Sequence, residues 1–543
     1  MKNVVPGVVA ALIVASGARA QDKTAEIDKI FSWVGPNMPG CVAAASRHGK
    51  LVLNRAYGLA DLERGVPLST DSVFDVASIR KQFVAAAVLL LVEEGRLSLA
   101  DDVRKHVPEL PDYGRTITLD QMLTHTSGLR DWVPLQNWTT NSSDPVMTMI
   151  LRQRGLNFAP GEEWSYSNSG YVLLAEVVAR TTRMTFPEFA RTRLFEPLGM
   201  KSAIFVDDLR QVVKSRALAY ERAGQGWRMD MRLEDRGGGA LFSTAADLLL
   251  WNDALTSARL GKFVSEKLQE PATLNNGRKL NYARGLMLGT NYTGRVIYHG
   301  GGSAAYRSIL GRFPEPGMSI AVLCNAGETS DARDDFAGFI LDLVVSPTGK
   351  RPATAAVADP PVEGLDVKSK AGLFFNDQTG ESLRLIVNGN RLAVAGGGPL
   401  TAVSKDRFRN PRPTTAFMSQ DAFELNFLSP DQFELKSMEG RTTRFRRAKP
   451  YTPAAAELQA FAGRYESDEL RAVLDVTPNK SGLTSRLNES PTQVFELGPV
   501  DPDTFQRGLQ TVRFLRDAAG KVIALELTNP ALRNIRFTRQ GRQ

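Results

Sequence analysis

Ser78 and Lys81 lie three residues apart, directly before an apolar segment from Gln82 to Glu94 that is typical of a buried helix. Residues three apart share one face of a helix, so the lysine amine is expected beside the serine hydroxyl. A serine becomes a strong nucleophile when a neighbouring base takes its proton, and a lysine can do so where burial or a nearby cation keeps it neutral. The start of a helix would also offer backbone amides to a developing oxyanion. The pair indicates nucleophilic catalysis. Taken alone, the spacing more often reflects a capping serine and a solvated lysine.

Two further segments carry side chains suited to such chemistry. Tyr166 and Asn168 lie in a Gly- and Ser-rich turn before the helical stretch Val172 to Arg180. His299 opens a run of three glycines after a strand-like segment, where missing side chains would let a substrate approach the strand edge. Considered one at a time, Tyr166 is more simply interpreted as a buried core tyrosine, and His299 as a hydrogen-bonded structural histidine. All three segments in this order favour one shared active site.

The three motifs resemble those of the serine hydrolase superfamily that contains class C β-lactamases, D,D-carboxypeptidases, D-aminopeptidases and related esterases. The segments Leu123–Leu129 and Gly237–Leu248 are similar to further landmarks of that superfamily. The resemblance covers about Ile27 to Val345.

This resemblance implies catalytic roles for four residues. Ser78 would be the acylated nucleophile, and Lys81 would be its base or the partner that tunes it. Tyr166 would carry a proton between the serine and the leaving group. His299 takes the position of the lysine in the Lys-Thr-Gly motif. The sequence leaves open whether Lys81 or Tyr166 takes the first proton.

The resemblance also implies binding roles. Asn168 would orient both substrate and Lys81, and the amides of Ser78 and Gly302 would form the oxyanion hole. Gly301 and Arg307 are further expected substrate contacts. Arg80, which stands where the superfamily has a small or hydroxylic residue, is expected to point off the catalytic face, with a role at the cleft rim left open.

His299 bears on the choice of substrate. Recognition of a substrate carboxylate requires a permanent cation, whereas an imidazole with a reference pKa of about 6.5 is mostly neutral at pH 7. His299 therefore favours a neutral or amine-bearing substrate, unless Arg307 restores the cation. We expect acyl transfer and hydrolysis of a small amide or ester, most similar to D-aminopeptidase activity and without a cofactor. A carboxylesterase or a β-lactamase of the same superfamily is the alternative. A catalytically silent receptor for peptidoglycan or peptides is the alternative from another class.

The fold expected from the resemblance is α+β, with an antiparallel sheet flanked by helices, a helical lobe, and two antiparallel β-barrels after it. Residues 21–346 would form the β-lactamase/transpeptidase-like catalytic domain, and 347–365 a Pro- and Ala-rich linker. The barrels would span 366–449 and 450–543, and alternating segments such as Leu383–Val387 and Arg391–Val394 around Asn388-Gly389 predict hairpins there.

The two barrel segments repeat each other. Gly372-Leu373-Phe374 and Gly463-Arg464-Tyr465 both open a unit, and Arg441–Arg447 and Arg533–Arg539 both close one. Between them, matched residues recur at the same internal spacing from Leu400 and from Leu497. Three matches in one order indicate a duplicated domain.

Composition and charge argue against nucleic-acid-binding proteins and metalloproteins. The chain has 543 residues, a formal net charge of +8 and a pI near 9.4, with basic residues spread evenly rather than in a stripe, so a solvated surface is favoured over nucleic-acid binding. An attraction to anionic cell-wall material fits this charge. His48, His106, His125 and His299 lack metal-ligand spacing, so no metal is expected. The sequence does not determine the oligomeric state.

The N-terminus indicates export. Lys2, an apolar run from Val4 to Val14 and Ala18-Arg19-Ala20 form a signal-peptide pattern with cleavage after Ala20, and no later stretch is long enough to span a membrane. We therefore expect a periplasmic or secreted protein. In the resembled fold, the strands containing Cys41 and Cys324 pair antiparallel, so the two cysteines should be neighbours, either as a disulfide or as two buried thiols.

Overall fold

The computed structural model describes most of the chain. The described residues are 25–139, 144–208, 210–230, 239–329, 333–345, 362–395, 398–410, 423–437, 441–449, 451–529 and 531–541. The predicted signal peptide, residues 1–20, lies outside these ranges, as does most of the predicted linker, since its described part begins at residue 362.

The catalytic domain is built on a six-stranded antiparallel sheet in the order β10-β11-β12-β13-β1-β2. Its strands are β1 (Cys41–Arg47), β2 (Lys50–Tyr57), β10 (Met287–Asn291), β11 (Gly294–Ser303), β12 (Tyr306–Phe313) and β13 (Met318–Cys324). Strand β1, between β13 and the edge strand β2, carries three consecutive alanines that are fully buried, because helices cover both faces of the sheet. Small side chains suit a strand enclosed on both sides.

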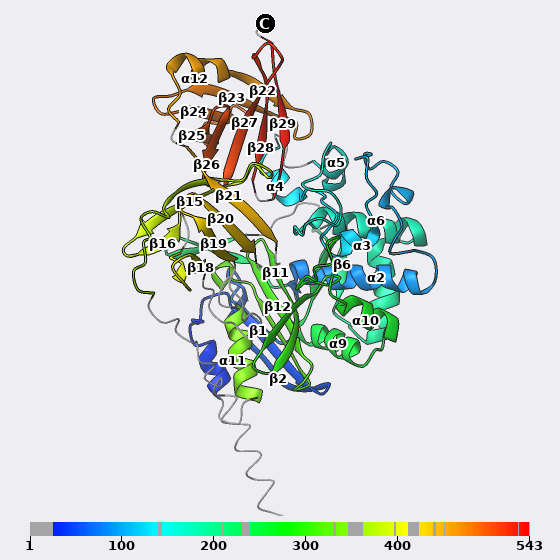
Figure 1. Cartoon of the computed structure of the whole chain (residues 1–543). Coiled ribbons are helices and arrows are strands. Elements are labelled where there is room, and N and C mark those ends of the chain that lie inside the picture. The colour runs from blue at the N-terminus through cyan, green and yellow to red at the C-terminus, as the bar shows by residue number, and fades with distance from the viewer. Residues whose placement is uncertain are drawn as a thin grey trace, which may run out of the picture.

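Helices form two layers around this sheet (Figure 1). On one side lies a helical lobe that contains α2 (Lys81–Glu93), α3 (Leu119–Leu123), α6 (Asn168–Thr182), α9 (Ala245–Thr256) and α10 (Lys262–Gln269). The other face is covered by α11 (Arg333–Val345) and the segment around Ile27 and Phe31. The predicted helix at Gln82–Glu94 is confirmed as α2, whose side chains are almost all buried. The predicted site residues lie at the boundary between lobe and sheet, in the turn before α2, at the start of α6 and in β11.

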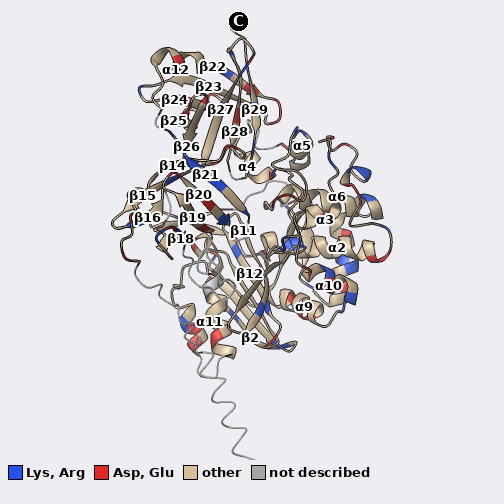
Figure 2. Cartoon of the chain, in the orientation of Figure 1, with Lys and Arg blue, Asp and Glu red and all other residues tan. Residues whose placement is uncertain are grey.

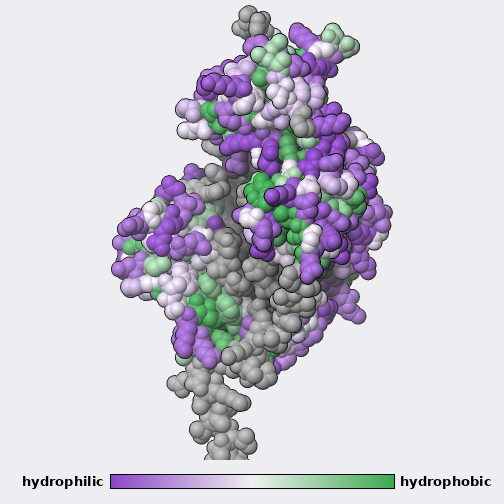
Figure 3. Space-filling view, turned by 60° about the vertical axis from the view of Figure 1, so that its left-hand side comes forward, coloured by the Kyte–Doolittle hydropathy of each residue, from purple (hydrophilic) through white to green (hydrophobic). Residues whose placement is uncertain are grey.

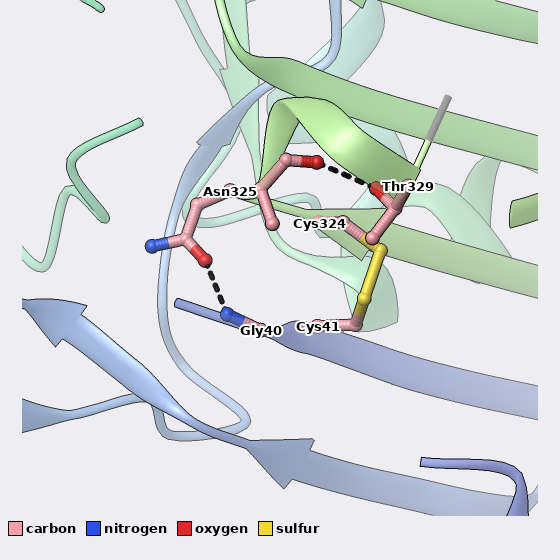
Figure 4. Close-up of a disulfide and its surroundings, with 6 residues drawn as sticks. Gly40, Cys41, Cys324, Asn325 and Thr329 are labelled. Atoms are coloured by element: carbon pink, nitrogen blue, oxygen red, sulfur yellow. Dashed lines mark hydrogen bonds between the residues drawn. A yellow bond between two sulfur atoms is a disulfide. The ribbon is translucent and has the colours of Figure 1, made fainter. Parts of the chain in front are cut away.

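Cys41 and Cys324 are joined by a disulfide (Figure 4). They face each other in the register of β1 and β13, with Cα atoms 4.0 Å apart. The side chain of Asn325 accepts a hydrogen bond from the Gly40 amide at 2.8 Å, which ties the two strand ends together beside the bridge. The expected proximity is confirmed, and the bonded alternative is the correct one.

Two antiparallel barrels follow, and Figure 1 shows them in yellow and in orange to red. The first runs from β14 to β21, and one bridge between Ala393 and Pro399 joins the ends of its eight-stranded sheet. Its strands are β14 (Gly372–Phe375), β15 (Ser382–Asn388), β16 (Arg391–Val394), β17 (Thr401–Ala402), β18 (Arg407–Arg409), β19 (Phe423–Ser429), β20 (Gln432–Ser437) and β21 (Thr442–Arg447). This confirms the first predicted barrel and its β15–β16 hairpin.

The second barrel is closed in the order β22 to β29. Its strands are β22 (Gly463–Ser467), β23 (Ala472–Pro478), β24 (Leu483–Leu487), β25 (Val494–Asp501), β26 (Thr504–Arg507), β27 (Gln510–Arg516), β28 (Val522–Thr528) and β29 (Ile535–Arg539). In both barrels the first strand also pairs with the last. The α+β class with two C-terminal barrels is therefore confirmed.

The repeated residues occupy equivalent places in the two barrels. A side chain on Gly372 would collide with Arg447, and one on Gly463 would collide with Arg539. Each arginine ends the last strand of its barrel, and each glycine begins the first strand. The same contact built from matched residues in both units supports the duplication read from the sequence.

The surface carries mixed charges. Figure 2 shows basic and acidic residues interspersed over the described parts of the catalytic domain and both barrels. On the face shown in Figure 3, hydrophilic residues dominate and hydrophobic ones form small groups. Among the described helices, none is both long and apolar enough to cross a bilayer.

Candidate active site

Ser78 is presented by a tight turn that the sheet edge holds in place. It lies in a 3₁₀ turn, Ala77–Arg80, which leads directly into α2. Ala77 has a φ of 51°, a left-handed conformation that costs energy for a residue with a side chain. Asp75 accepts a hydrogen bond from the Ala77 amide at 2.8 Å and another from the Ser303 hydroxyl at 2.8 Å. These contacts fix the turn against the end of β11.

Lys81 is the nearest basic group to the Ser78 hydroxyl. Its Nζ lies 3.2 Å from Ser78 Oγ, as expected because residues three apart are aligned in a 3₁₀ turn. The side chain is 1% exposed. Burial, followed by the positive charge of Arg80, holds the pKa of the Lys81 amine well below its ordinary value, while the negative charge of Asp131 acts in the opposite direction. A lowered pKa favours the neutral amine that a base requires.

Asn168 and Asp131 hold the lysine from its other side. The Lys81 amine donates to Asn168 Oδ1 at 2.7 Å. Asn168 in turn donates to Asp131 twice, from its amide side chain at 2.9 Å and from its backbone at 3.1 Å. Asp131 thereby fixes which end of the Asn168 amide faces Lys81. Burial raises the pKa of this carboxyl, and its hydrogen bonds oppose that shift.

Tyr166 lies over the lysine, with its ring centroid 4.6 Å from Lys81 Nζ. Burial raises the pKa of the Tyr166 phenol, and a hydrogen bond with Ser78 acts in the opposite direction. The phenol is therefore protonated at neutral pH and can act as a donor. Tyr166 contacts both Ser78 and Lys81, an arrangement that suits proton transfer among the three side chains.

Behind Tyr166 lies a buried layer of aromatic and imidazole rings. The ring centroids of His125 and Tyr166 are 4.4 Å apart. Burial, then the charges of Lys81 and His299, lower the pKa of His125 well below its ordinary value, so its imidazole is neutral. Its Nδ1 accepts the Ser167 amide at 3.1 Å, which leaves the proton on Nε2, 3.0 Å from Tyr282 Oη.

The third motif is divided between this layer and the site. His299 is 2% exposed, with its ring centroid 6.2 Å from that of Tyr166 and its Nε2 3.4 Å from Tyr282 Oη. A Cβ on Gly301 would lie 2.2 Å from the Val76 carbonyl, so this glycine lets β11 pack directly on the nucleophile turn. Arg307 donates to the Ala304 carbonyl at 2.6 Å, beside the predicted site.

These side chains surround a pocket of about 260 Å³. The described residues that line it include Ser78, Lys81, Tyr166, Asn168, Gly302, Ser303, Ala304, Trp132, Val133, Gln136 and Arg80. His299, Gly301 and Arg307 are absent from the described lining. Arg80 is among the lining residues, and its guanidinium donates a hydrogen bond to the Gly239 carbonyl at 2.7 Å.

Sequence reasoning missed Asp131. It follows the Leu123–Leu129 segment by two residues, and its role appears only when α6 packs against it. A larger hollow of about 1190 Å³ lies elsewhere, around Thr185, Met200 and Val213, and shares no lining residue with the catalytic pocket. Among the described residues, no group of three or more His, Cys, Asp or Glu side chains could hold a metal ion.

Comparisons with known proteins agree with this arrangement. The family model described as Beta-lactamase matches residues 22–343. Penicillin-binding protein 4* of Bacillus subtilis (strain 168) is 28% identical over 338 residues, which cover 57% of this chain and 74% of that protein.

Two solved structures match further along the chain. The octameric penicillin-binding protein homologue from Pyrococcus abyssi has a TM-score of 0.52 at 21% identity, over 80% of this chain and all of that chain. The crystal structure of SurE has a TM-score of 0.51 at 20% identity, over 97% of this chain and all of that chain. At these identities the two structures show a shared fold, and the second extends it to the barrels.

Proposed function

The chain belongs to the beta-lactamase family, within the superfamily of penicillin-binding and β-lactamase-like serine hydrolases, and from that premise we propose that it hydrolyses a small amide or ester through an acyl-enzyme on Ser78. The observation that carries this proposal is the buried Lys81 amine, 3.2 Å from Ser78 Oγ, with a lowered pKa. A solvated, cationic lysine at this distance could not accept the proton.

We assign the first proton transfer to Lys81 and the second to Tyr166. Burial lowers the pKa of the lysine and raises that of the tyrosine, so at neutral pH the amine has an acceptor form and the phenol keeps its proton. Two neighbouring groups whose pKa values are shifted apart suit the separate roles of base and acid. Asn168 keeps the amine directed at Ser78 during both transfers.

The reaction follows from these positions. Ser78 Oγ bonds to the substrate carbonyl carbon while its proton passes to Lys81, and the amides of Ser78 and Gly302 donate hydrogen bonds to the resulting oxyanion. The bond to the leaving amine or alcohol then breaks as Tyr166 gives it a proton, and the proton on Lys81 returns to Tyr166. Water then attacks the acyl carbon and gives a proton to neutral Lys81, and as the bond from this carbon to Ser78 Oγ breaks, the proton passes to Ser78 Oγ and the acid is released.

The size and charge of the pocket support a small substrate. Its volume of about 260 Å³ is below the roughly 300–1,000 Å³ typical of sites for drug-sized ligands. His299 supplies no permanent cation at the third motif. We therefore propose D-amino acid amides, short peptides or short acyl esters as substrates, so the activity is of the D-aminopeptidase or carboxylesterase kind.

A substrate with a carboxylate is the second candidate, and Arg80 is the observation that favours it. Its guanidinium group is a permanent cation, and the residue lines the same pocket as Ser78. A β-lactam or a peptide with a free C-terminus would place its carboxylate there. Binding of penicillin, for which the Bacillus subtilis relative is named, fits this candidate.

We further propose that the protein acts in the periplasm or outside the cell, where short cell-wall peptides are available. The signal-peptide pattern in residues 1–20 supports this location. The Cys41–Cys324 disulfide is compatible with it, because such bonds persist in oxidising compartments.

A substrate panel tests the proposal. We would compare D- and L-aminoacyl p-nitroanilides, p-nitrophenyl esters and nitrocefin, with the Ser78→Ala variant as the control for turnover without the nucleophile. We expect turnover of small anilides or esters that exceeds that of nitrocefin and is lost in Ser78→Ala. Nitrocefin hydrolysis alone would instead favour the carboxylate candidate. Penicillin binding without turnover of any compound would identify a receptor.

A further inference from the structure

The two barrels contact the catalytic domain close to its proton-transfer residues, yet none of the described residues that line the pocket comes from a barrel. A barrel could therefore affect the reaction by fixing the residues that line the pocket. Two of these contacts are ionic, one at Glu163 and one at Arg130.

Glu163 is held by one arginine from each barrel. Arg533 of the second barrel donates to both carboxylate oxygens of Glu163, each at 3.0 Å. Arg441 of the first barrel binds the same carboxylate at 2.9 Å. Glu381 of the first barrel contacts both arginines, at 3.3 and 3.4 Å, so the four charges form a closed network.

The two arginines are equivalent residues of the repeat. Arg441 and Arg533 each begin the segment that closes their barrel, and both reach one carboxylate of the catalytic domain. The side chain of Arg533 is 6% exposed and that of Arg441 is 21% exposed. A bidentate arginine contact in a setting shielded from water is stronger than an exposed ion pair and fixes orientation. Glu163 precedes Tyr166 by three residues, so the network anchors the loop of the catalytic tyrosine.

The second contact, at Arg130, is connected to Lys81 through Asp131 and Asn168. Glu469 of the second barrel accepts a hydrogen bond from Arg130 at 2.6 Å, and both side chains are under 10% exposed. Arg130 also donates to the carbonyls of Arg533 and Asn534 at 2.8 and 3.0 Å. The next residue is Asp131, which binds Asn168 and through it Lys81.

Helix α4 (Trp132–Gln136), which follows Arg130 in the chain, contributes residues both to the pocket and to the contact with the second barrel. Figure 1 shows α4 at the end of that barrel. Trp132, Val133 and Gln136 line the catalytic pocket. Leu135 and Trp138, in contrast, are buried in the apolar core of the barrel. The ring centroids of Trp138 and Phe495 are 5.6 Å apart.

We propose that the two barrels position the proton-transfer residues of the catalytic site through two ionic contacts, one at Glu163 and one at Arg130. This inference rests on the proposed function, since it assigns those residues to proton transfer. Displacement of a catalytic group by about 1 Å can cost 100-fold in rate. Loss of either contact should therefore lower kcat and leave KM nearly unchanged.

Glu469→Gln and Arg441→Gln in the full chain test the two contacts. The matched controls are Glu489→Gln, which breaks an exposed pair with Arg464 on the same barrel as Glu469, and Arg444→Gln, which breaks an exposed pair with Glu434. We expect kcat to fall about tenfold or more in the test variants, with KM within about twofold. Both controls should match wild type.

Two further measurements separate positioning from general destabilisation. Glu469→Gln should cause no additional loss of kcat in an Asp131→Asn background, because both changes break one chain of contacts. Thermal melting would show that each variant is folded at the assay temperature, and Arg441→Lys offers a milder change should Arg441→Gln fail to fold.

Hydrogen exchange supplies a readout that needs no substrate. We expect faster exchange of amides in residues 163–168 in Arg441→Gln, and at the start of α6 in Glu469→Gln. If wild type turns over nothing, the proposed function fails, while exchange still tests the positioning. Unchanged exchange and kcat in both test variants, equal losses in the controls, or full additivity with Asp131→Asn would overturn the inference.

Discussion

Arg80→Gln and Asp131→Asn should move the pH dependence of the reaction in opposite directions. Lys81 acts as a base only when neutral, so kcat/KM rises as pH increases through the pKa of Lys81. The Arg80 cation lowers that pKa, and removing it raises the pKa and moves the acidic limb to higher pH. The Asp131 carboxylate raises that pKa, and its removal moves the limb to lower pH.

The geometry of the Asn168 bridge sets the size of the Asp131 effect. Hydrogen bonds of 2.7 and 2.9 Å on either side of one amide place the amine and the carboxylate about 8 Å apart at most. At an effective dielectric constant of about 20, unit charges at that distance interact by about 2 kcal/mol, so loss of the Asp131 charge should move the acidic limb by a readily measurable amount. Arg80, which has the larger influence on Lys81, should produce a shift at least as large.

The assay is the pH profile of kcat/KM for wild type and both variants, measured on the best substrate of the panel. The readout is the pH at which the acidic limb of the profile lies. The plateau value of kcat/KM is not used, because it also falls when a substitution disturbs the geometry of the site. No basic limb from Tyr166 should appear below about pH 10, since burial raises the pKa of its phenol above the ordinary value. Shifts in the same direction for both variants would refute Lys81 as the first base.

Three other changes have defined outcomes. Tyr166→Phe should lower kcat/KM by about 100-fold or more with an unchanged melting temperature, and near wild-type turnover would exclude the tyrosine as the proton donor. Gly301→Ala, whose Cβ would lie 2.2 Å from the Val76 carbonyl, should lower both stability and activity, whereas Gly302→Ala, whose Cβ would lie 4.0 Å from the nearest heavy atom, should melt as wild type does. Removing the disulfide by Cys41→Ala with Cys324→Ala should cost about 5 kcal/mol, because the bridge closes a loop of 283 residues. Differential scanning calorimetry measures this loss, and an unchanged melting temperature would contradict it.

Local sequence patterns predicted the core of the site because its partners are close in the chain. Ser78 and Lys81 are three residues apart, and one turn suffices to align them. Tyr166 and Asn168 share one loop at the start of α6. The facing positions of Cys41 and Cys324 followed from the resembled fold.

The remaining features depend on packing between distant segments. Asp131 gains its contact with the site through Asn168, and Arg80 is held by the carbonyl of Gly239, a residue 159 positions away in the chain. The contact between Glu163 and Arg533 spans 370 residues and forms only when a barrel docks. Neither periodicity nor spacing encodes such contacts, since they are properties of the assembled surfaces.

Intact-mass and peptide mass spectrometry after treatment with a fluorophosphonate tests the central claim most directly. We expect one covalent adduct per chain, on Ser78, with slower labelling in Lys81→Ala and none in Ser78→Ala. The serine in Ser-x-x-Lys then acts as the nucleophile that the geometry indicates. An adduct on another residue, or labelling that persists in Ser78→Ala, would contradict the account.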